Sequence, residues 1–229
     1  MLTLPWLPQV EISLPFTVVP SNFGIMHTNT QFKNPLPNKN ALFDFAAAGS
    51  VLGMSASIAS LVWGLILTAS TKSSEIATLP HVSLDFLKLS ALTTATIEST
   101  LGTDVLLSLD PLSDNVAVHP FVLAGHVGIL ANALNLLPAA KTLDGGRMVK
   151  AVSEIGFGLI KVSILLFLLV QGFRDLQVSN FLLVYSFFLL FQPEDLPCKN
   201  DVDKANGPLR LPLVIATTLL SLVALSPSL

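Results

Sequence analysis

Long apolar segments with few charged positions recur along the chain, and they predict helices that cross a membrane. The first, Phe45–Thr68, has no charged residue, and its length suits a hydrocarbon core about 30 Å thick. Four more follow it: Phe121–Pro138, Ile155–Gly172 with Lys161 inside it, and the shorter Leu176–Phe191 and Leu211–Leu225. The pattern predicts an all-α membrane protein, a polytopic helical bundle with four or five transmembrane helices.

Two other segments have different patterns. Residues 1–40 alternate short apolar runs with Pro and Asn, which predicts short strands in a hairpin, with the prolines at sheet edges. From His81 to Gly102, apolar residues recur at helical spacing among charged ones, as in an amphipathic helix at a membrane surface. We therefore divide the chain into an N-terminal hairpin or interfacial segment, residues 1–40, and a transmembrane domain, residues 41–229.

Composition and charge support a membrane setting. Charged residues make up 12% of the chain and the mean hydropathy is +0.70, whereas soluble domains carry about 25% charged residues. The net charge of −3 argues against nucleic acid as a partner. The loop after the first span is acidic, so the positive-inside rule puts the opposite, lysine-rich side in the cytosol, or in the stroma of a plastid. Small residues fill the first half of Phe45–Thr68, which predicts a central helix with close neighbours.

Neither the cysteine content nor the N-terminus adds a site. Cys198 is the single cysteine, so the chain forms no internal disulfide, and we expect a loop cysteine. Met1–Pro20 lacks the basic region of a secretory signal, so a targeting segment is expected to be removed or to lie upstream.

The run from Asn135 to Arg147 is the most informative stretch for chemistry. Asn135 lies near the end of the predicted helix Phe121–Pro138, and Pro138 ends that helix. Asp144 is followed by Gly145 and Gly146, a sequence typical of a tight turn. The simplest interpretation is a helix break with Asp144 capping the next helix, but a polar residue on each side of one break in a membrane also suggests a site.

These residues resemble a known family. The chain contains Asn-Leu-Leu-Pro, followed after four residues by Leu-Asp-Gly-Gly-Arg. This run is similar to the second signature of site-2 proteases, the intramembrane zinc metalloproteases. The segments from Val118 to Gly125 and from Phe23 to Gly49 resemble the chloroplast and cyanobacterial branch named for an ethylene-dependent gravitropism-deficient and yellow-green (EGY) phenotype. The resemblance implies an integral protein of a thylakoid or other plastid membrane.

The resemblance also implies a zinc site. In that family two histidines of an H-E-x-x-H helix and the aspartate of the second signature, here Asp144, hold zinc, and the glutamate activates water. The bound metal lowers the pKa of that water, so that hydroxide can attack a peptide carbonyl. Asn135 would then lie beside the substrate carbonyl.

This sequence departs from the family at the zinc helix. None of its four histidines, His27, His81, His119 and His126, is followed by glutamate, so it has no H-E-x-x-H. The zinc helix should precede Ile12–Phe16, where Pro5 and Pro8 instead rule out an ordinary helix. Ser50 stands where the family usually has proline. His119 and His126 are about 10 Å apart along a helix, too far to hold one metal, and we expect interfacial or buried, hydrogen-bonded histidines.

Three functions follow, and they leave enzyme status open. The leading hypothesis is a catalytically inactive scaffold, assembly factor or subunit of a chloroplast (thylakoid) membrane complex, with Asn135 and Asp144 vestigial, no metal or other cofactor, and lipid and membrane proteins as partners. The second is an active intramembrane zinc metalloprotease whose H-E-x-x-H helix lies outside the sequence shown, with Asp144 as a zinc ligand. The third is a pigment- or lipid-contacting photosystem subunit that binds chlorophyll through His119 or His126.

Overall fold

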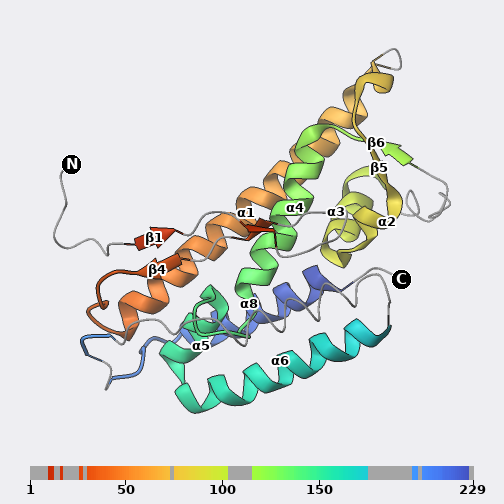
Figure 1. Cartoon of the computed structure of the whole chain (residues 1–229). Helices are drawn as coiled ribbons and strands as arrows, with labels where there is room; N and C mark the ends of the chain where they lie inside the picture. The colour runs from red at the N-terminus through yellow and green to blue at the C-terminus, as the bar shows by residue number, and fades with distance from the viewer. Residues whose placement is uncertain are drawn as a thin grey trace, which may run out of the picture. The chain divides into compact units, whose positions relative to one another are not determined.

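Helices dominate the part of the chain that the computed structural model describes (Figure 1). That part comprises residues 10–12, 16–17, 26–27, 30–72, 75–102, 115–174, 198–200 and 203–226. The helices are α1 (Lys39–Ser70), α2 (Leu84–Lys88), α3 (Ala91–Leu101), α4 (Pro120–Leu136), α5 (Asp144–Val152), α6 (Glu154–Arg174) and α8 (Arg210–Leu225), with one 3-10 turn, Ile76–Thr78. The predicted helical class is confirmed.

Short antiparallel strands precede α1, as the alternation within residues 1–40 predicted. β1 (Val10–Ile12) pairs with β4 (Thr30–Phe32), and β2 (Phe16–Thr17) pairs with β3 (Met26–His27). A third pair, β5 (His81–Ser83) with β6 (Asn115–Ala117), was not predicted. The predicted amphipathic helix over 81–102 is therefore a strand followed by two helices, α2 and α3, because Ser90 caps a new helix by accepting a hydrogen bond from the Thr93 amide (3.2 Å).

The chain divides into two compact units, described separately here. The first, which we call the Asp144 unit, comprises Met1–Ser50 and Asn135–Thr218. The second, the His126 unit, comprises Val51–Leu134 and Leu219–Leu229. The predicted boundary after residue 40 stays a prediction.

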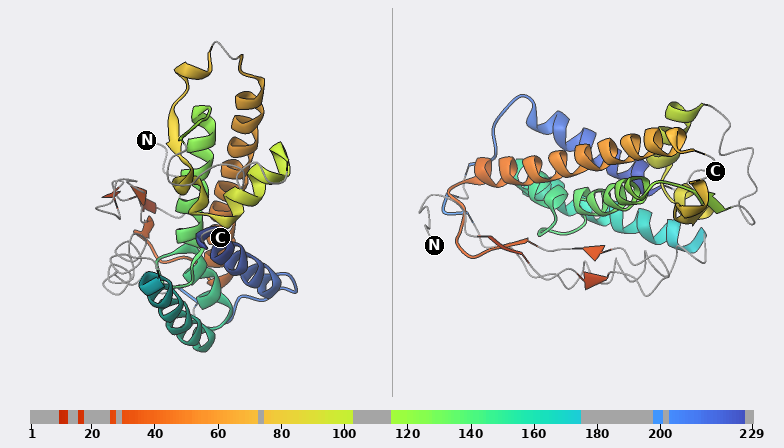
Figure 2. Two further views of the ribbon diagram at one scale, coloured as in Figure 1. Left: turned by 90° about the vertical axis from the view of Figure 1, so that its right-hand side faces the viewer. Right: turned by 90° about the horizontal axis from the view of Figure 1, so that it is seen from above.

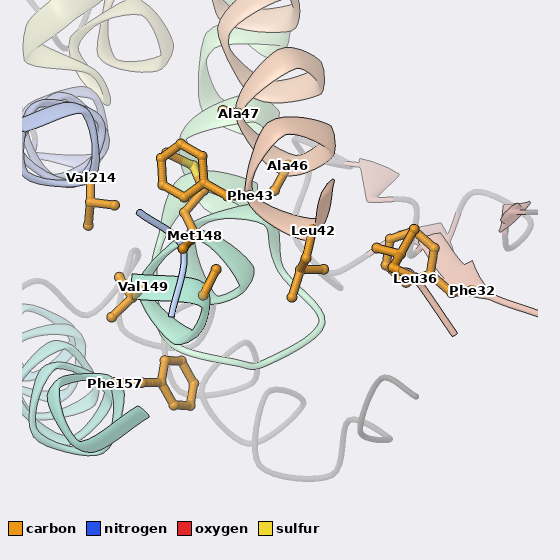
Figure 3. Close-up of a cluster of buried hydrophobic side chains, with 12 residues drawn as sticks. Phe32, Leu36, Leu42, Phe43, Ala46, Ala47, Met148, Val149, Phe157 and Val214 are labelled. Atoms are coloured by element: carbon orange, nitrogen blue, oxygen red, sulfur yellow. The ribbon is translucent and has the colours of Figure 1, made fainter. Parts of the chain in front are cut away.

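A hydrophobic cluster forms the core of the Asp144 unit (Figure 3). It joins β4, the start of α1, α5, α6 and α8, and its members are Phe32, Leu36, Leu42, Phe43, Ala46, Ala47, Met148, Val149, Ala151, Phe157, Ala205 and Val214. The segment before α8 is fixed to this core through its backbone. The amides of Lys199 and Ala205 donate to the carbonyls of Leu36 (2.8 Å) and Ala151 (2.8 Å). These contacts hold the start of α1 and the end of α5 in place.

Small residues set the packing in the His126 unit. The second half of α1 and α4 run antiparallel and side by side (Figures 1 and 2). A Cβ added at Gly64 would overlap the backbone of Val122, and one added at Gly125 would overlap the backbone of Leu61. Such close backbone approach is what stabilises helix pairs in lipid. The small residues predicted to pack closely include Ser57, and a Cβ added at Gly128 of α4 would overlap its hydroxyl.

The predicted crossings are supported in part. Among the described residues, α1 is the helix that is both long and apolar enough to cross a membrane, and α4 and α8 are apolar but shorter. α6 coincides with the predicted third span, and the predicted span Leu176–Phe191 lies outside the described residues. Four or five crossings therefore stay a prediction.

Candidate functional site

Asp144 lies where α5 begins, after a turn that leads from the end of α4. α4 ends at Leu136, two residues before Pro138, as predicted. Leu143 is in an extended conformation and occupies the cap position, and Asp144 is the first helical residue. The expectation that Asp144 caps the helix was therefore wrong by one position. Its carboxylate instead bonds to side chains from other parts of the unit.

Two neutral donors share one oxygen of Asp144. The Ser50 hydroxyl, from α1, donates to Oδ2 at 2.7 Å, and the Asn135 side-chain amide donates to the same atom at 2.6 Å. The Asp144 backbone amide donates back to Asn135 Oδ1 at 3.3 Å. The two polar residues that flank the break are thus bonded to each other, which removes the cost of burying either alone.

Arg147 pairs with the other carboxylate oxygen of Asp144, Oδ1. Its guanidinium forms an ion pair with Asp144 Oδ1 at 3.3 Å, one helical turn further along α5, and its side chain is completely buried. The guanidinium also lies over the ring of Phe32, in β4, with 4.8 Å between Cζ and the ring centroid. A buried arginine keeps its charge, so it requires an anion beside it. The sequence indicated neither Ser50 nor Arg147 as a partner of Asp144.

The two glycines after Asp144 are explained by close packing of the turn. A Cβ at Gly145 would overlap the carbonyl group of Leu136, and one at Gly146 would overlap the carbonyl oxygen of Ala140. Only glycine lets the first turn of α5 lie directly against this backbone. The Asp-Gly-Gly sequence therefore fixes where the carboxylate lies.

Burial and hydrogen bonding shift the pKa of the Asp144 carboxyl in opposite directions. Desolvation raises its pKa above the ordinary value, whereas the Ser50 and Asn135 hydrogen bonds and the charge of Arg147 lower it. Burial is the largest of these effects, so on balance the pKa is raised. All three side chains donate to the carboxyl oxygens and favour the ionised form. Asp144 is thus a buried carboxyl group held by protein donors.

This arrangement does not fit a zinc ion. A zinc site of the implied kind needs two imidazoles beside the aspartate. Within the described ranges, no group of three His, Cys, Asp or Glu side chains lies close enough to hold a metal. Both oxygens of Asp144 already accept bonds, from Ser50 and Asn135 on one side and from Arg147 on the other.

His126 forms a separate buried cluster in the His126 unit. The imidazole, on α4, is completely buried, and its Nδ1 lies 2.9 Å from the Thr93 hydroxyl of α3. The ring of Phe86, in α2, packs edge-on against it, with 4.5 Å between ring centroids. In the part of the chain described, His126 Nε2 has no hydrogen-bond partner. The prediction of a buried, hydrogen-bonded histidine is confirmed.

His119 lies outside that cluster, immediately before α4. Its amide donates to the Thr68 hydroxyl (2.9 Å), and its Nδ1 accepts from the Phe121 amide (3.3 Å), so it fixes the start of the helix. The structure does not bring His119 into the His126 cluster. An axial ligand for a pigment needs open space beside the ring nitrogen, which a completely buried imidazole such as His126 does not offer. Chlorophyll binding stays a prediction without support from this geometry.

The Thr93–His126 contact gives a testable stability effect. Thr93→Val keeps the shape of the side chain but removes the hydroxyl that bonds to Nδ1 of the buried imidazole, which is expected to cost about 1–3 kcal/mol. Thr100→Val is the matched control, since Thr100 is exposed on the same helix, and it should change stability by less than about 0.5 kcal/mol. Chemical unfolding of the detergent-solubilised protein measures both, and equal effects would contradict the role given to Thr93.

Comparison with known proteins places the chain among relatives of plant zinc metalloproteases. It is similar to two proteins called probable zinc metalloprotease EGY1, chloroplastic. With that of Oryza sativa subsp. japonica it is 29% identical over 218 residues, 93% of this chain and 35% of the relative. With that of Arabidopsis thaliana it is 29% identical over 223 residues, 96% of this chain and 38% of the relative. The chain is a homologue of the EGY zinc metalloproteases, as the motif resemblance predicted.

The similarity covers little more than a third of each EGY1 protein. A third relative, the DDT domain-containing protein PTM of Arabidopsis thaliana, is 33% identical over 142 residues, 62% of this chain and 8% of that protein. No family model matches the chain. No solved structure matches it either.

Proposed function

We propose that this chain is a non-catalytic homologue of the EGY proteins that serves as a scaffold or subunit of a plastid membrane complex. The observation that carries the proposal is the bonding of Asp144. Its Oδ2 accepts from Ser50 and Asn135, and its Oδ1 is paired with Arg147. A carboxylate held in this way stabilises the fold, and a metal would have to displace a buried arginine from it.

Two further observations support a role without catalysis. The sequence shown contains no H-E-x-x-H, so it supplies no water-activating glutamate of the kind the family uses. The relative PTM is named for a DDT domain and not for a protease. A segment of this kind therefore also occurs in a protein whose name describes no cleavage.

The setting in a plastid membrane has its own support. The EGY1 relatives are named as chloroplastic, and α1 has the length and composition of a membrane span. The thylakoid is the membrane we propose within the plastid. Other membrane proteins and lipid are the proposed partners.

A cleavage assay tests the proposal. The protein is purified from its native membrane, reconstituted in lipid vesicles and incubated with a transmembrane peptide, with and without a zinc chelator. We expect no chelator-sensitive cleavage, and we expect the same peptide pattern from Asp144→Asn, because the carboxylate takes no part in chemistry. Cleavage that both the chelator and Asp144→Asn abolish would instead establish the zinc metalloprotease hypothesis, with the zinc helix supplied from outside this sequence.

A further inference from the structure

The His126 cluster contains a buried ionisable group beside uncharged neighbours. The imidazole, carried by α4, is completely buried where α2 and α3 pack against that helix. The polar groups beside the ring are the Thr93 hydroxyl, 2.9 Å from Nδ1, and the backbone of Phe86, and neither has a charge. In the described part of the chain, Nε2 has no hydrogen-bond partner. Within that part, the cluster therefore offers no anion to a protonated ring.

Charged groups occur on the elements around the cluster but not in it. The ionisable side chains on these elements are Asp85 and Lys88 of α2, Glu98 of α3, His81 of β5 and His119 before α4. Asp85 and His81 are exposed, and among the described residues none of the five bonds to the imidazole. The parts of α1 and α8 that belong to the His126 unit have no ionisable side chain. A proton on His126 would thus add a charge with no counterion among the described neighbours.

The lack of an anion makes the closed cluster a poor site for a proton. A solvated imidazole has an ordinary pKa of about 6.5, whereas a charge buried without a counterion is strongly unfavourable. If α2 and α3 move off α4, His126 meets water and can bind a proton. Because the open form then binds one more proton than the closed form, the opening equilibrium rises about tenfold for each pH unit below ~6.5.

We propose that His126 makes the packing of α2 and α3 against α4 sensitive to pH, so that acidification releases these two helices. Opening would uncover their apolar inner faces, which are formed by Leu84, Leu87 and Ile97. The charge distribution predicts that α2 and α3 lie on the side away from the cytosol or stroma, so the pH of that compartment would control the opening. The inference goes beyond the scaffold role and does not depend on it.

Hydrogen exchange of α3, measured by mass spectrometry at pH 7, 6 and 5 in detergent, tests the proposal. An isolated helix of eleven residues is barely stable, so the amides of α3 exchange when the helix leaves α4. His126→Asn is the reference at each pH, because asparagine keeps a polar atom near the position of Nδ1 and binds no proton. Dividing the two rates cancels the direct effect of pH on exchange. Most carboxylates stay ionised down to pH 5.

We expect the exchange rate of α3 in the natural sequence, relative to His126→Asn, to rise about tenfold or more between pH 7 and pH 5. His119→Asn is the matched control, since His119 lies outside the cluster and asparagine can also cap a helix, and it should show the same rise as the natural sequence. His126→Phe, which keeps a ring, is the reference if His126→Asn does not fold. A ratio that stays constant with pH would overturn the inference, and so would a rise that His119→Asn abolishes.

Discussion

Replacing Asp144 with alanine is expected to lower the free energy of unfolding by about 3–5 kcal/mol, a large share of the stability of a typical domain. The variant removes the carboxylate that is paired with the completely buried guanidinium of Arg147 and that accepts hydrogen bonds from Ser50 and Asn135. Denaturant unfolding in detergent measures the effect. It should be the same with and without added zinc, because the lost interactions are with protein groups.

Asp44→Ala is the matched control for Asp144→Ala. Asp44 also pairs with an arginine, Arg210 at 3.0 Å, but its side chain is 65% exposed. Exposed ion pairs contribute little, so a change of at most about 1 kcal/mol is expected. Restoring stability in Asp144→Asn by adding Arg147→Met would show that losing the carboxylate beside the buried guanidinium causes the loss. An Asp144→Ala protein as stable as the Asp44→Ala protein would contradict the structural role of the buried carboxylate.

Gly146→Ala is expected to be the second severe substitution, with a loss of about 3 kcal/mol. The new Cβ would overlap the carbonyl oxygen of Ala140, which is backbone and cannot rotate away. The first turn of α5 would have to move, and the Asp144 carboxylate with it. Thermal unfolding in detergent measures the loss.

Gly158→Ala is the control for Gly146→Ala on the neighbouring helix α6. A Cβ at Gly158 meets no atom within 4 Å, so alanine should be neutral or should stabilise the helix by up to about 1 kcal/mol. If Gly146→Ala and Gly158→Ala were equally stable, that result would contradict the close packing of the first turn of α5 against the carbonyl oxygen of Ala140.

Local signals in the sequence predicted the elements around the site. The uncharged run of α1, the end of α4 before Pro138 and the polar pair Asn135 and Asp144 all follow from residue patterns over a few turns. The hydrogen bonds between Asn135 and Asp144 were not predicted, because two polar residues beside one helix break suggested only that a site lies there.

Contacts between distant segments could not be predicted in the same way. Ser50 is 94 residues from Asp144, and Phe32 comes from a strand far from Arg147 in sequence. Ser50 gave a signal, since it stands where the family usually has proline, but its bond to Asp144 depends on how α1 packs. The β5–β6 pair and the Thr93–His126 bond likewise arise from tertiary packing, which a hydrophobic pattern does not specify.

The central claim is that protein donors, and not a metal, hold the Asp144 carboxylate. Zinc content measured by mass spectrometry on the protein purified from its native membrane, without chelator, tests it most directly. We predict far less than one zinc per chain, with no difference between the natural sequence and Asp144→Asn. One zinc per chain that disappears in Asp144→Asn would contradict the claim.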